Sequence, residues 1–282
     1  MHFELNPEYQ LDKSVYETKK ASFQKVKELN ELFLNETYLG NKVAYYYENI
    51  KTGDSFAFNK DRLFYAASTI KILTCLLFFE KASNNEIDLD RELLITSADL
   101  KPGTGIIKNQ SEDTKYSILD LIRLTIVESD NTAYLKLVSL VGKDKIKEYG
   151  NSLGAIHTME GKETDSFGLV NTSDMIIYLK KIKSFIDNNP KYGALFKDYL
   201  LNPSYMIVND DTIGNNKFYR KYGFYDIAYH EVGFVNDDYF VIILTQLGTK
   251  DYRDSFINTA FLKIANLHES IESSQNDGIM DL

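Results

Sequence analysis

Segments with the residue pattern of β-strands lie near both ends of this 282-residue chain, and segments with helical spacing lie between them. Strands are expected at residues 43–47 and 55–58, around a polar turn, and at the aromatic and β-branched residues 217–224, 227–235 and 239–246. Apolar residues recur at helical spacing in residues 23–33, 68–82, 118–126, 132–140, 172–185 and 252–267. This order predicts an α+β fold. One antiparallel five-stranded sheet would be built from both ends of the chain, flanked by N- and C-terminal helices, with an inserted all-helical lobe.

The same order divides the chain into three stretches. Residues 1–65 would supply a helix and the first hairpin, residues 66–205 the helical lobe, and residues 206–282 three strands and a closing helix. The tail after Ser270 is polar, and we expect it to fray.

The composition excludes several classes of function. A net charge of −9 without a basic stripe argues against binding to nucleic acid or to an anionic membrane surface. The single cysteine, Cys75, permits neither an internal disulfide nor a cysteine metal cluster, and its apolar surroundings favour a core position. The four histidines are scattered, so we expect no metal site and no cofactor.

No segment is expected to span a membrane. The longest apolar stretch, residues 72–79, is far shorter than the ~20 residues that a transmembrane helix needs. Residues 1–20 are polar and lack the pattern of a signal peptide. The expected location is therefore the cytoplasm if the chain is complete, or outside it if an export segment has been removed.

Three short motifs match functional patterns but have simpler explanations. Residues 150–154 read G-x-S-x-G, yet a charged, helix-like segment precedes them where a nucleophile elbow needs a buried strand, so a glycine turn at a helix end is preferred. Residues 22–25 read S-x-x-K on an amphipathic helix, a pattern expected about once by chance in such a chain. Residues 51–53 read K-T-G within the first hairpin turn, where glycine supplies a positive φ.

A second S-x-x-K motif, residues 68–71, opens the most apolar helix in the sequence. Positions i and i+3 share a helix face, so the Lys71 amine can reach the Ser68 hydroxyl. The serine also lies at a helix N-terminus, where unpaired N–H groups favour developing negative charge. A buried lysine with a lowered pKa is what a general base for serine needs. An equally good interpretation of this segment alone is a serine N-cap beside a lysine that extends to solvent.

Two further motifs favour the interpretation of Lys71 as a general base for Ser68. The tripeptide Ser129-Asp130-Asn131, which alone could be a helix cap, lies 61 residues after Ser68. Lys221-Tyr222-Gly223 begins the hairpin of C-terminal strands. With S-x-x-K, S-D-N and K-x-G in this order, residues 41–267 resemble the penicillin-recognising serine hydrolases, specifically the class A β-lactamase-like group and its D-Ala-D-Ala peptidase relatives. The resemblance implies a β-lactamase/transpeptidase-like fold.

The resemblance implies a set of catalytic roles. Ser68 would be the nucleophile that opens an amide or β-lactam carbonyl and becomes acylated. Lys71 would take its proton, directly or through water, and Ser129 would relay a proton to the leaving nitrogen.

It also implies how a small-molecule substrate, a β-lactam or a peptidoglycan stem-peptide analogue, would be held. Asn131 would bind the substrate's side-chain amide and help to orient Lys71, and Lys221 would supply positive field for Ser129 and the substrate carboxylate. The backbone N–H groups of Ser68 and of Phe224, the residue after Gly223, would form the oxyanion hole.

The sequence departs from the family pattern at two places. Tyr222 stands where a threonine or serine hydroxyl would bond the substrate carboxylate, so Tyr222 would weaken binding of ordinary penicillins or reshape the cleft. No E-x-x-L-N loop follows the S-D-N helix, and Glu160, Glu163 and Asp165 are the candidate bases for activating the deacylating water. For each of the three, a solvated loop charge is the simpler explanation.

Four functions follow as hypotheses. The first is a class A β-lactamase-like hydrolase that acts through Ser68. The others are a D-Ala-D-Ala carboxypeptidase-like penicillin-binding protein, a covalent β-lactam sensor with slow deacylation, and a catalytically degenerate homologue. Slow release of the acyl group would favour the peptidase or the sensor, and no acylation would favour the degenerate homologue.

Overall fold

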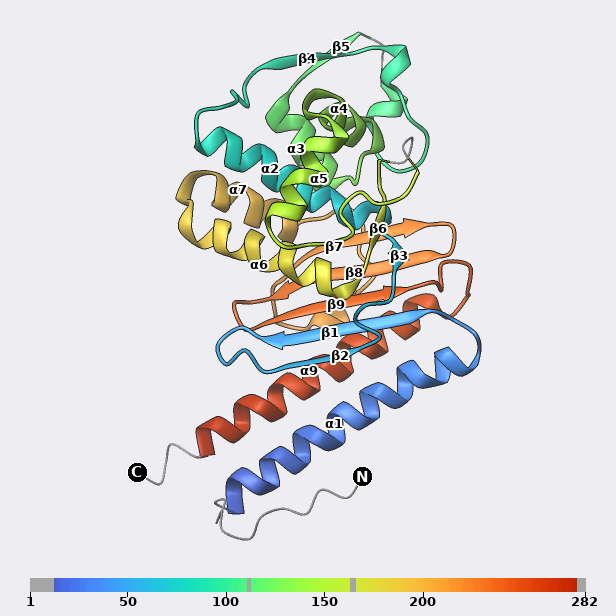
Figure 1. Ribbon diagram of the computed structural model, residues 1–282, viewed down its shortest axis with the longest axis vertical. Helices are drawn as coiled ribbons and strands as arrows, with labels where there is room; N and C mark the ends of the chain where they lie inside the picture. Colours follow the sequence, from blue (N-terminus) through green and yellow to red (C-terminus); the bar gives the residue numbers. More distant parts are fainter. Residues whose placement is uncertain (1–12, 111–112, 163–165, 278–282) are drawn as a thin grey trace.

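The computed structural model describes residues 13–110, 113–162 and 166–277, which form a sheet with helices on both faces (Figure 1). Its helices are α1 (Lys13–Tyr38), α2 (Lys71–Ser83), α3 (Ile118–Val127), α4 (Asn131–Val141), α5 (Lys143–Ser152), α6 (Thr172–Asn188), α7 (Pro190–Leu201), α8 (Asp210–Ile213) and α9 (Arg253–Asp277), with 3₁₀ turns η1 (Ala67–Ile70), η2 (Ser97–Asp99) and η3 (Ile107–Asn109). Its strands are β1 (Val43–Asn49), β2 (Ser55–Phe58), β3 (Phe64–Tyr65), β4 (Glu92–Ile95), β5 (Thr114–Ser117), β6 (Leu169–Val170), β7 (Phe218–Tyr225), β8 (Ala228–Val235) and β9 (Tyr239–Thr245).

The predicted five-stranded antiparallel sheet is confirmed, in the order β2-β1-β9-β8-β7. Strand β1 pairs with β9 from Val43 opposite Thr245 to Asn49 opposite Tyr239, so the N-terminal hairpin completes the sheet that the C-terminal strands begin. This pairing leaves β7 at one edge of the sheet, facing the helical lobe (Figure 1).

Two cores fill the spaces on either side of the sheet. Helices α1 and α9 cross one face side by side, and α2 to α7 lie over the other (Figure 1). Helix α2 is buried on all sides for most of its length, including Cys75 as predicted. None of the helices in the described ranges is long and apolar enough to cross a membrane.

The lobe between the strands is mainly helical, and it also contains two short ribbons that the sequence did not reveal. Strand β3 pairs with β6, and β4 pairs with β5. Strands of two to four residues are too short to show a period-two pattern, so their pairing depends on the tertiary structure that brings them together.

The tail expected to fray after Ser270 continues α9 as far as Asp277, and residues 278–282 lie outside the described residues. Ile271 is 8% exposed and packs in the core below the sheet. Glu272 accepts a hydrogen bond from Asn49 Nδ2 at 2.9 Å and lies 3.6 Å from Lys51 Nζ. Contacts with the first hairpin therefore hold this polar segment in the helix.

The three motifs with simpler explanations lie where they were expected. Residues 150–154 end α5, with Gly154 at φ +102°, and no strand leads into them. Residues 51–53 form the turn between β1 and β2, with Gly53 at φ +76°. Residues 22–25 lie within α1.

Candidate active site

Ser68 lies in a tight turn between the sheet and the most buried helix. The turn η1 runs directly into α2, so the helix predicted from residue 68 begins instead with a 3₁₀ turn. Ala67 has φ +47°, a left-handed conformation that costs a non-glycine residue roughly 1–2 kcal/mol and persists only where the surrounding structure holds it. Side chains at i and i+3 of a 3₁₀ turn point the same way, which places Ser68 and Lys71 on one side.

The side chain of Lys71 is buried, so the alternative of a lysine that extends to solvent is wrong. Its Nζ lies 2.5 Å from the carbonyl oxygen of Ser129, 2.8 Å from Asn131 Oδ1 and 3.3 Å from Ser129 Oγ, all within hydrogen-bond distance. Within the described residues, no hydrogen bond joins Lys71 Nζ to Ser68. Burial and the nearby charge of Lys221 lower the pKa of Lys71 well below its usual range, which favours the neutral amine.

The S-D-N motif forms the link between α3 and α4. Asp130 caps α4 by accepting from the backbone N–H of Ala133 at 2.9 Å, and its other oxygen accepts from Ile106 at 2.7 Å and Ile107 at 2.8 Å. A Cβ at Gly105, which has φ +111°, would lie 2.2 Å from that oxygen, so only glycine fits there. Asp130 therefore fixes the loop of residues 102–107 against the start of α4.

That loop in turn positions the flanking residues of the motif. Thr104 Oγ1 donates to the carbonyl of Ser129 at 2.7 Å, and Asn131 Nδ2 donates to the carbonyl of Pro102 at 2.9 Å. Ser129 itself has φ +50°, a second left-handed non-glycine residue beside Lys71. The sequence analysis did not identify Thr104, although the run Pro102-Gly103-Thr104-Gly105 has the composition of a turn.

Lys221 reaches Ser129 from the edge strand β7. Its Nζ donates to Ser129 Oγ at 2.9 Å and to the carbonyl of Tyr222 at 3.0 Å. Burial lowers the pKa of Lys221 to about 7. The Ser129 hydroxyl thus lies between two buried amines, within hydrogen-bond distance of both.

Gly223 lets β7 approach the turn that carries Ser68. A Cβ at this position would lie 2.9 Å from Thr69 Cγ2 and 3.1 Å from the carbonyl oxygen of Ala66. Any larger residue would push the strand away from η1. The next residue, Phe224, pairs with Tyr229 of β8 and lines the cleft in front of Ser68.

The cleft has a volume of about 700 Å³, and its exposed lining is mainly apolar. Its lining consists of Tyr65, Ala67, Ser68, Lys101, Pro102, Gly103, Thr104, Asn131, Leu135, Ser166, Phe167, Phe224, Tyr225 and Asp226. Lys71, Ser129 and Lys221 are buried behind this surface. Tyr222 lines a neighbouring cavity instead, with its ring 4.0 Å from Lys221 Nζ and 5.0 Å from the Tyr205 ring.

Of the three predicted deacylation bases, the described residues include Glu160. Glu160 points to His157, with its Oε2 2.5 Å from His157 Nδ1, and it does not line the cleft. Glu163 and Asp165 lie outside the described residues. The cleft wall on this side is formed by Phe167, whose ring lies 5.7 Å from Lys71 Nζ and 5.1 Å from the Tyr134 ring. No sequence pattern pointed to Phe167.

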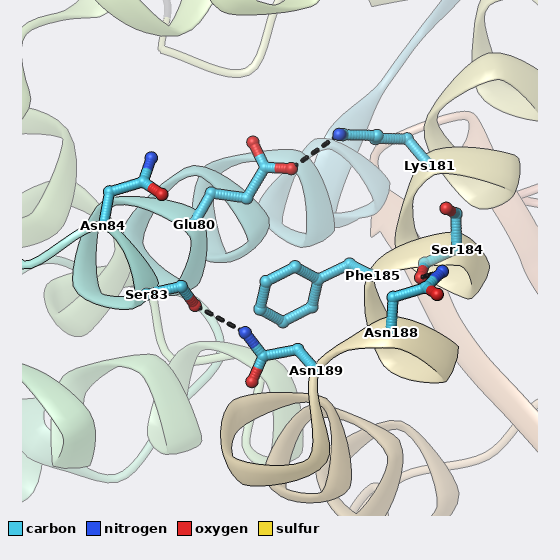
Figure 2. Close-up of a pocket in the computed structure, with 8 residues that line it drawn as sticks. All are labelled: Glu80, Ser83, Asn84, Lys181, Ser184, Phe185, Asn188 and Asn189. Atoms are coloured by element: carbon cyan, nitrogen blue, oxygen red, sulfur yellow. Dashed lines mark hydrogen bonds and ion pairs between the residues drawn. The ribbon is translucent and has the colours of Figure 1, made fainter.

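A second cavity of about 450 Å³ lies between the C-terminal end of α2 and α6 (Figure 2). Glu80 forms an ion pair with Lys181 at 2.7 Å and accepts from Tyr149 Oη at 2.7 Å, and Asn189 Nδ2 donates to Ser83 Oγ. These polar groups satisfy one another, so the cleft at Ser68 is the better candidate site. In the described ranges, no three His, Cys, Asp or Glu residues are grouped so as to hold a metal ion.

His230 connects the site to the sheet as a neutral imidazole. Its Nε2 donates to the carbonyl of Tyr65 at 2.8 Å, and its Nδ1 accepts from the Thr245 N–H at 3.1 Å. Because this ring is buried, its pKa is lowered from 6.5 to about 4.

This burial predicts a pH dependence of stability. Between pH 4 and 6.5 this imidazole binds a proton in the unfolded state but not in the folded state. The free energy of unfolding is therefore highest above pH 6.5 and falls by about 3 kcal/mol as the pH drops to 4. The free energy of unfolding, measured with urea across this range, should vary less steeply with pH in His230→Gln than in the wild type. Equal slopes for the two proteins would contradict the assignment.

Comparisons with known proteins identify the family and the fold. The family model described as "Beta-lactamase enzyme family" matches residues 24–267. No curated protein matches the sequence. Among solved structures, a PBP-A mutant in its acyl-enzyme complex with penicillin G is 18% identical with a TM-score of 0.79, over 88% of this chain and 97% of that chain.

Two β-lactamases are similar to the same extent. The enzyme from Sphaerobacter thermophilus is 20% identical with a TM-score of 0.73, over 86% of this chain and 96% of that chain. The class A enzyme from Mycobacterium abscessus is 17% identical with a TM-score of 0.75, over 86% of this chain and 98% of that chain. At these identities the structures establish the fold, and the family model extends over most of the chain. The chain therefore belongs to the beta-lactamase enzyme family.

Proposed function

We propose that this protein is a serine hydrolase that forms an acyl-enzyme on Ser68 with a β-lactam or a D-Ala-D-Ala-like amide. The observation that carries the proposal is the buried chain from Lys71 Nζ through Ser129 Oγ to Lys221 Nζ, with distances of 3.3 and 2.9 Å. It begins three residues after Ser68, which lines the cleft. A neutral amine beside a serine supplies the base that the hydroxyl needs, and a second hydroxyl between two amines supplies a path for the proton.

In the proposed acylation step, Lys71 and Ser129 each end with the same number of protons with which they began. Ser68 Oγ forms a bond to the substrate carbonyl carbon while its proton passes to the neutral Lys71 amine. The carbon–nitrogen bond then breaks, and the nitrogen takes the hydroxyl proton of Ser129. The Lys71 ammonium restores that proton to Ser129 along their hydrogen bond. The N–H groups of Ser68 and Phe224 would stabilise the oxyanion, a contribution of about 10²–10³ in rate per donor.

The substrate class is supported by the family and by one similar structure. A mutant of PBP-A, which has a similar fold, forms an acyl-enzyme complex with penicillin G, and the family is that of β-lactamases. The side chain of Asn131 lines the cleft beside Lys71, where it can bind the acylamino group of a small-molecule substrate.

A second candidate, a penicillin-binding peptidase or covalent sensor with slow deacylation, is favoured by the wall opposite β7. Hydrolysis of the acyl-enzyme requires a water activated by a base. Phe167 covers the side of the cleft next to Lys71, and Glu160 is engaged by His157 away from it. An apolar ring at this place would exclude the water and prolong the life of the acyl-enzyme.

The mass of the intact protein, followed over time after addition of a penicillin, tests both candidates. We expect an adduct on the wild type, an adduct of equal yield on Ser22→Ala, and none on Ser68→Ala. The serine of the other S-x-x-K motif thus serves as the matched control. An adduct that disappears as the drug is consumed indicates a β-lactamase, and one that persists indicates the second candidate. Labelling of Ser68→Ala at the wild-type level, or no adduct on the wild type, would reject the proposal.

A further inference from the structure

The peptide after Tyr65 leads into the turn that carries Ser68, and it is held at both ends. Its carbonyl oxygen lies 2.8 Å from His230 Nε2, and its N–H group donates to the carbonyl of Gly168 at 3.0 Å. The left-handed residue Ala67, with φ +47°, follows this peptide and precedes the serine. Because a peptide unit is planar, its orientation sets the direction in which the chain enters the strained turn.

The hydrogen bonds of the His230 ring determine which nitrogen carries its proton. Nδ1 lies 3.1 Å from the backbone nitrogen of Thr245, which can only donate, so Nδ1 is the acceptor. The neutral ring then carries its proton on Nε2 and donates it to the Tyr65 carbonyl. The side chain is fully buried, and the Phe64 ring packs edge-on against it, with 5.9 Å between the ring centroids. The imidazole therefore has one position and one tautomer.

The same ring lies beside the strand that carries the second proposed oxyanion donor. His230 of β8 is paired with Gly223 of β7, and a Cβ at Gly223 would lie 3.3 Å from His230 Cδ2. The next residue along β7 is Phe224, whose N–H group is the proposed partner of the Ser68 N–H group in the oxyanion hole. His230 thus holds the peptide that leads to one donor and lies against the strand that carries the other.

We infer that His230 is a positioning residue for the oxyanion hole: its Nε2–H group fixes the peptide after Tyr65 and so aligns the N–H group of Ser68 with that of Phe224. The inference rests on the proposed acylation of Ser68. His230 does not line the cleft, so it acts through the backbone that it holds. Two N–H groups stabilise an oxyanion only when both point at it, and a displacement of about 1 Å can cost about 10²-fold in rate. Loss of this hydrogen bond therefore slows the acylation step and leaves the binding of the substrate nearly unchanged.

Amide side chains replace the two nitrogens of His230 one at a time. In His230→Gln the amide nitrogen reaches about as far from the backbone as Nε2 does, and it can donate to the Tyr65 carbonyl. In His230→Asn the shorter amide reaches only the place of Nδ1, where its oxygen can accept from the Thr245 N–H group, and no group donates to Tyr65. His230→Leu is close in size to the glutamine variant and makes neither hydrogen bond.

The test measures the rate constant of acylation at saturating penicillin and the concentration that gives half of it, by intact mass, with circular dichroism to establish that each variant is folded. We expect His230→Gln to stay within about threefold of the wild-type rate constant, and His230→Asn and His230→Leu to lose about 10- to 100-fold. The half-saturating concentration should change by less than about threefold in all three variants.

The matched control is a second buried histidine, His268 of α9, whose Nδ1 lies 3.0 Å from Tyr47 Oη. Its replacement, His268→Asn, should leave the rate constant of acylation at the wild-type value, because neither residue contacts the turn of Ser68. A slowing of this control equal to that of His230→Asn would overturn the inference.

A purely structural role of His230 would lower the free energy of unfolding in all three variants without separating glutamine from asparagine and leucine in the rate constant. Equal rate constants in the three variants would therefore overturn the inference and leave the proposed function in place. If the asparagine and leucine variants do not fold, the nitrogen chemical shifts of the wild-type imidazole decide: we expect the proton on Nε2, and a proton on Nδ1 would overturn the inference. No adduct on the wild type would overturn the proposed function and the inference with it.

Discussion

Replacement of Lys71 by methionine is expected to slow the acylation of Ser68 by about 10³-fold. General base catalysis by a positioned side chain typically contributes 10²–10⁴ in rate, and methionine has a similar shape but no amine. The loss should be specific to the reaction, because Thr104 still donates to the Ser129 carbonyl and to Asn131 Oδ1. Rates of adduct formation with penicillin give the measurement.

The pH dependence of the same rate provides the second half of this test. Since the pKa of Lys71 is lowered by burial and by Lys221, the neutral base is present at neutral pH, and the wild-type rate should fall only as pH drops through that lowered value. This limb should vanish in Lys71→Met. Lys25→Met, the lysine of the S-x-x-K motif in α1, is the matched control and should react as the wild type. A Lys71→Met protein that reacts within tenfold of the wild type would contradict the assignment.

Replacement of Asp130 by alanine is expected to lower the free energy of unfolding by about 4 kcal/mol. The carboxylate is 1% exposed and accepts hydrogen bonds from three backbone N–H groups, those of Ala133, Ile106 and Ile107. Removal leaves these donors buried without a partner, and each such loss costs about 1–3 kcal/mol. Urea unfolding measures the change.

The matched control is another acid in the first turn of a helix. Asp144 of α5 is exposed, and Asp144→Ala should change the free energy of unfolding by less than about 0.5 kcal/mol. Asp130→Asn retains one acceptor oxygen, so its free energy of unfolding should lie between those of the two alanine variants. A loss of less than about 1 kcal/mol in Asp130→Ala would show that the loop of residues 102–107 is held by other contacts.

The fold could be predicted largely because its strands and helices differ in local pattern. The aromatic and β-branched strands at both ends pair as expected, and the helices between them have clear apolar spacing. The ribbons β3–β6 and β4–β5 and the continuation of α9 past Ser270 depend on contacts between distant segments. Glu272 with Asn49 is one such contact, and no local pattern encodes it.

The residues of the candidate site could likewise be predicted only in part. The three motifs indicated Ser68, Lys71, Ser129, Asn131 and Lys221. The structure joins the last four in one buried set of hydrogen bonds and places Ser68 in the turn that leads into Lys71. Phe167, Thr104 and His230 contribute through their position alone, because a phenylalanine or a threonine has no signature until its neighbours are known. The direction of Tyr222, toward Tyr205 and away from the main cleft, likewise follows from the packing at the sheet edge.

The most direct test of the central claim is to locate the acyl group on the chain. The protein is treated with a penicillin, digested with a protease, and the fragments are analysed by mass spectrometry. We expect the added mass on the fragment that carries Ser68, and a lower yield at early times in Lys71→Met. An added mass on any other residue, or none, would show that Ser68 is not the nucleophile.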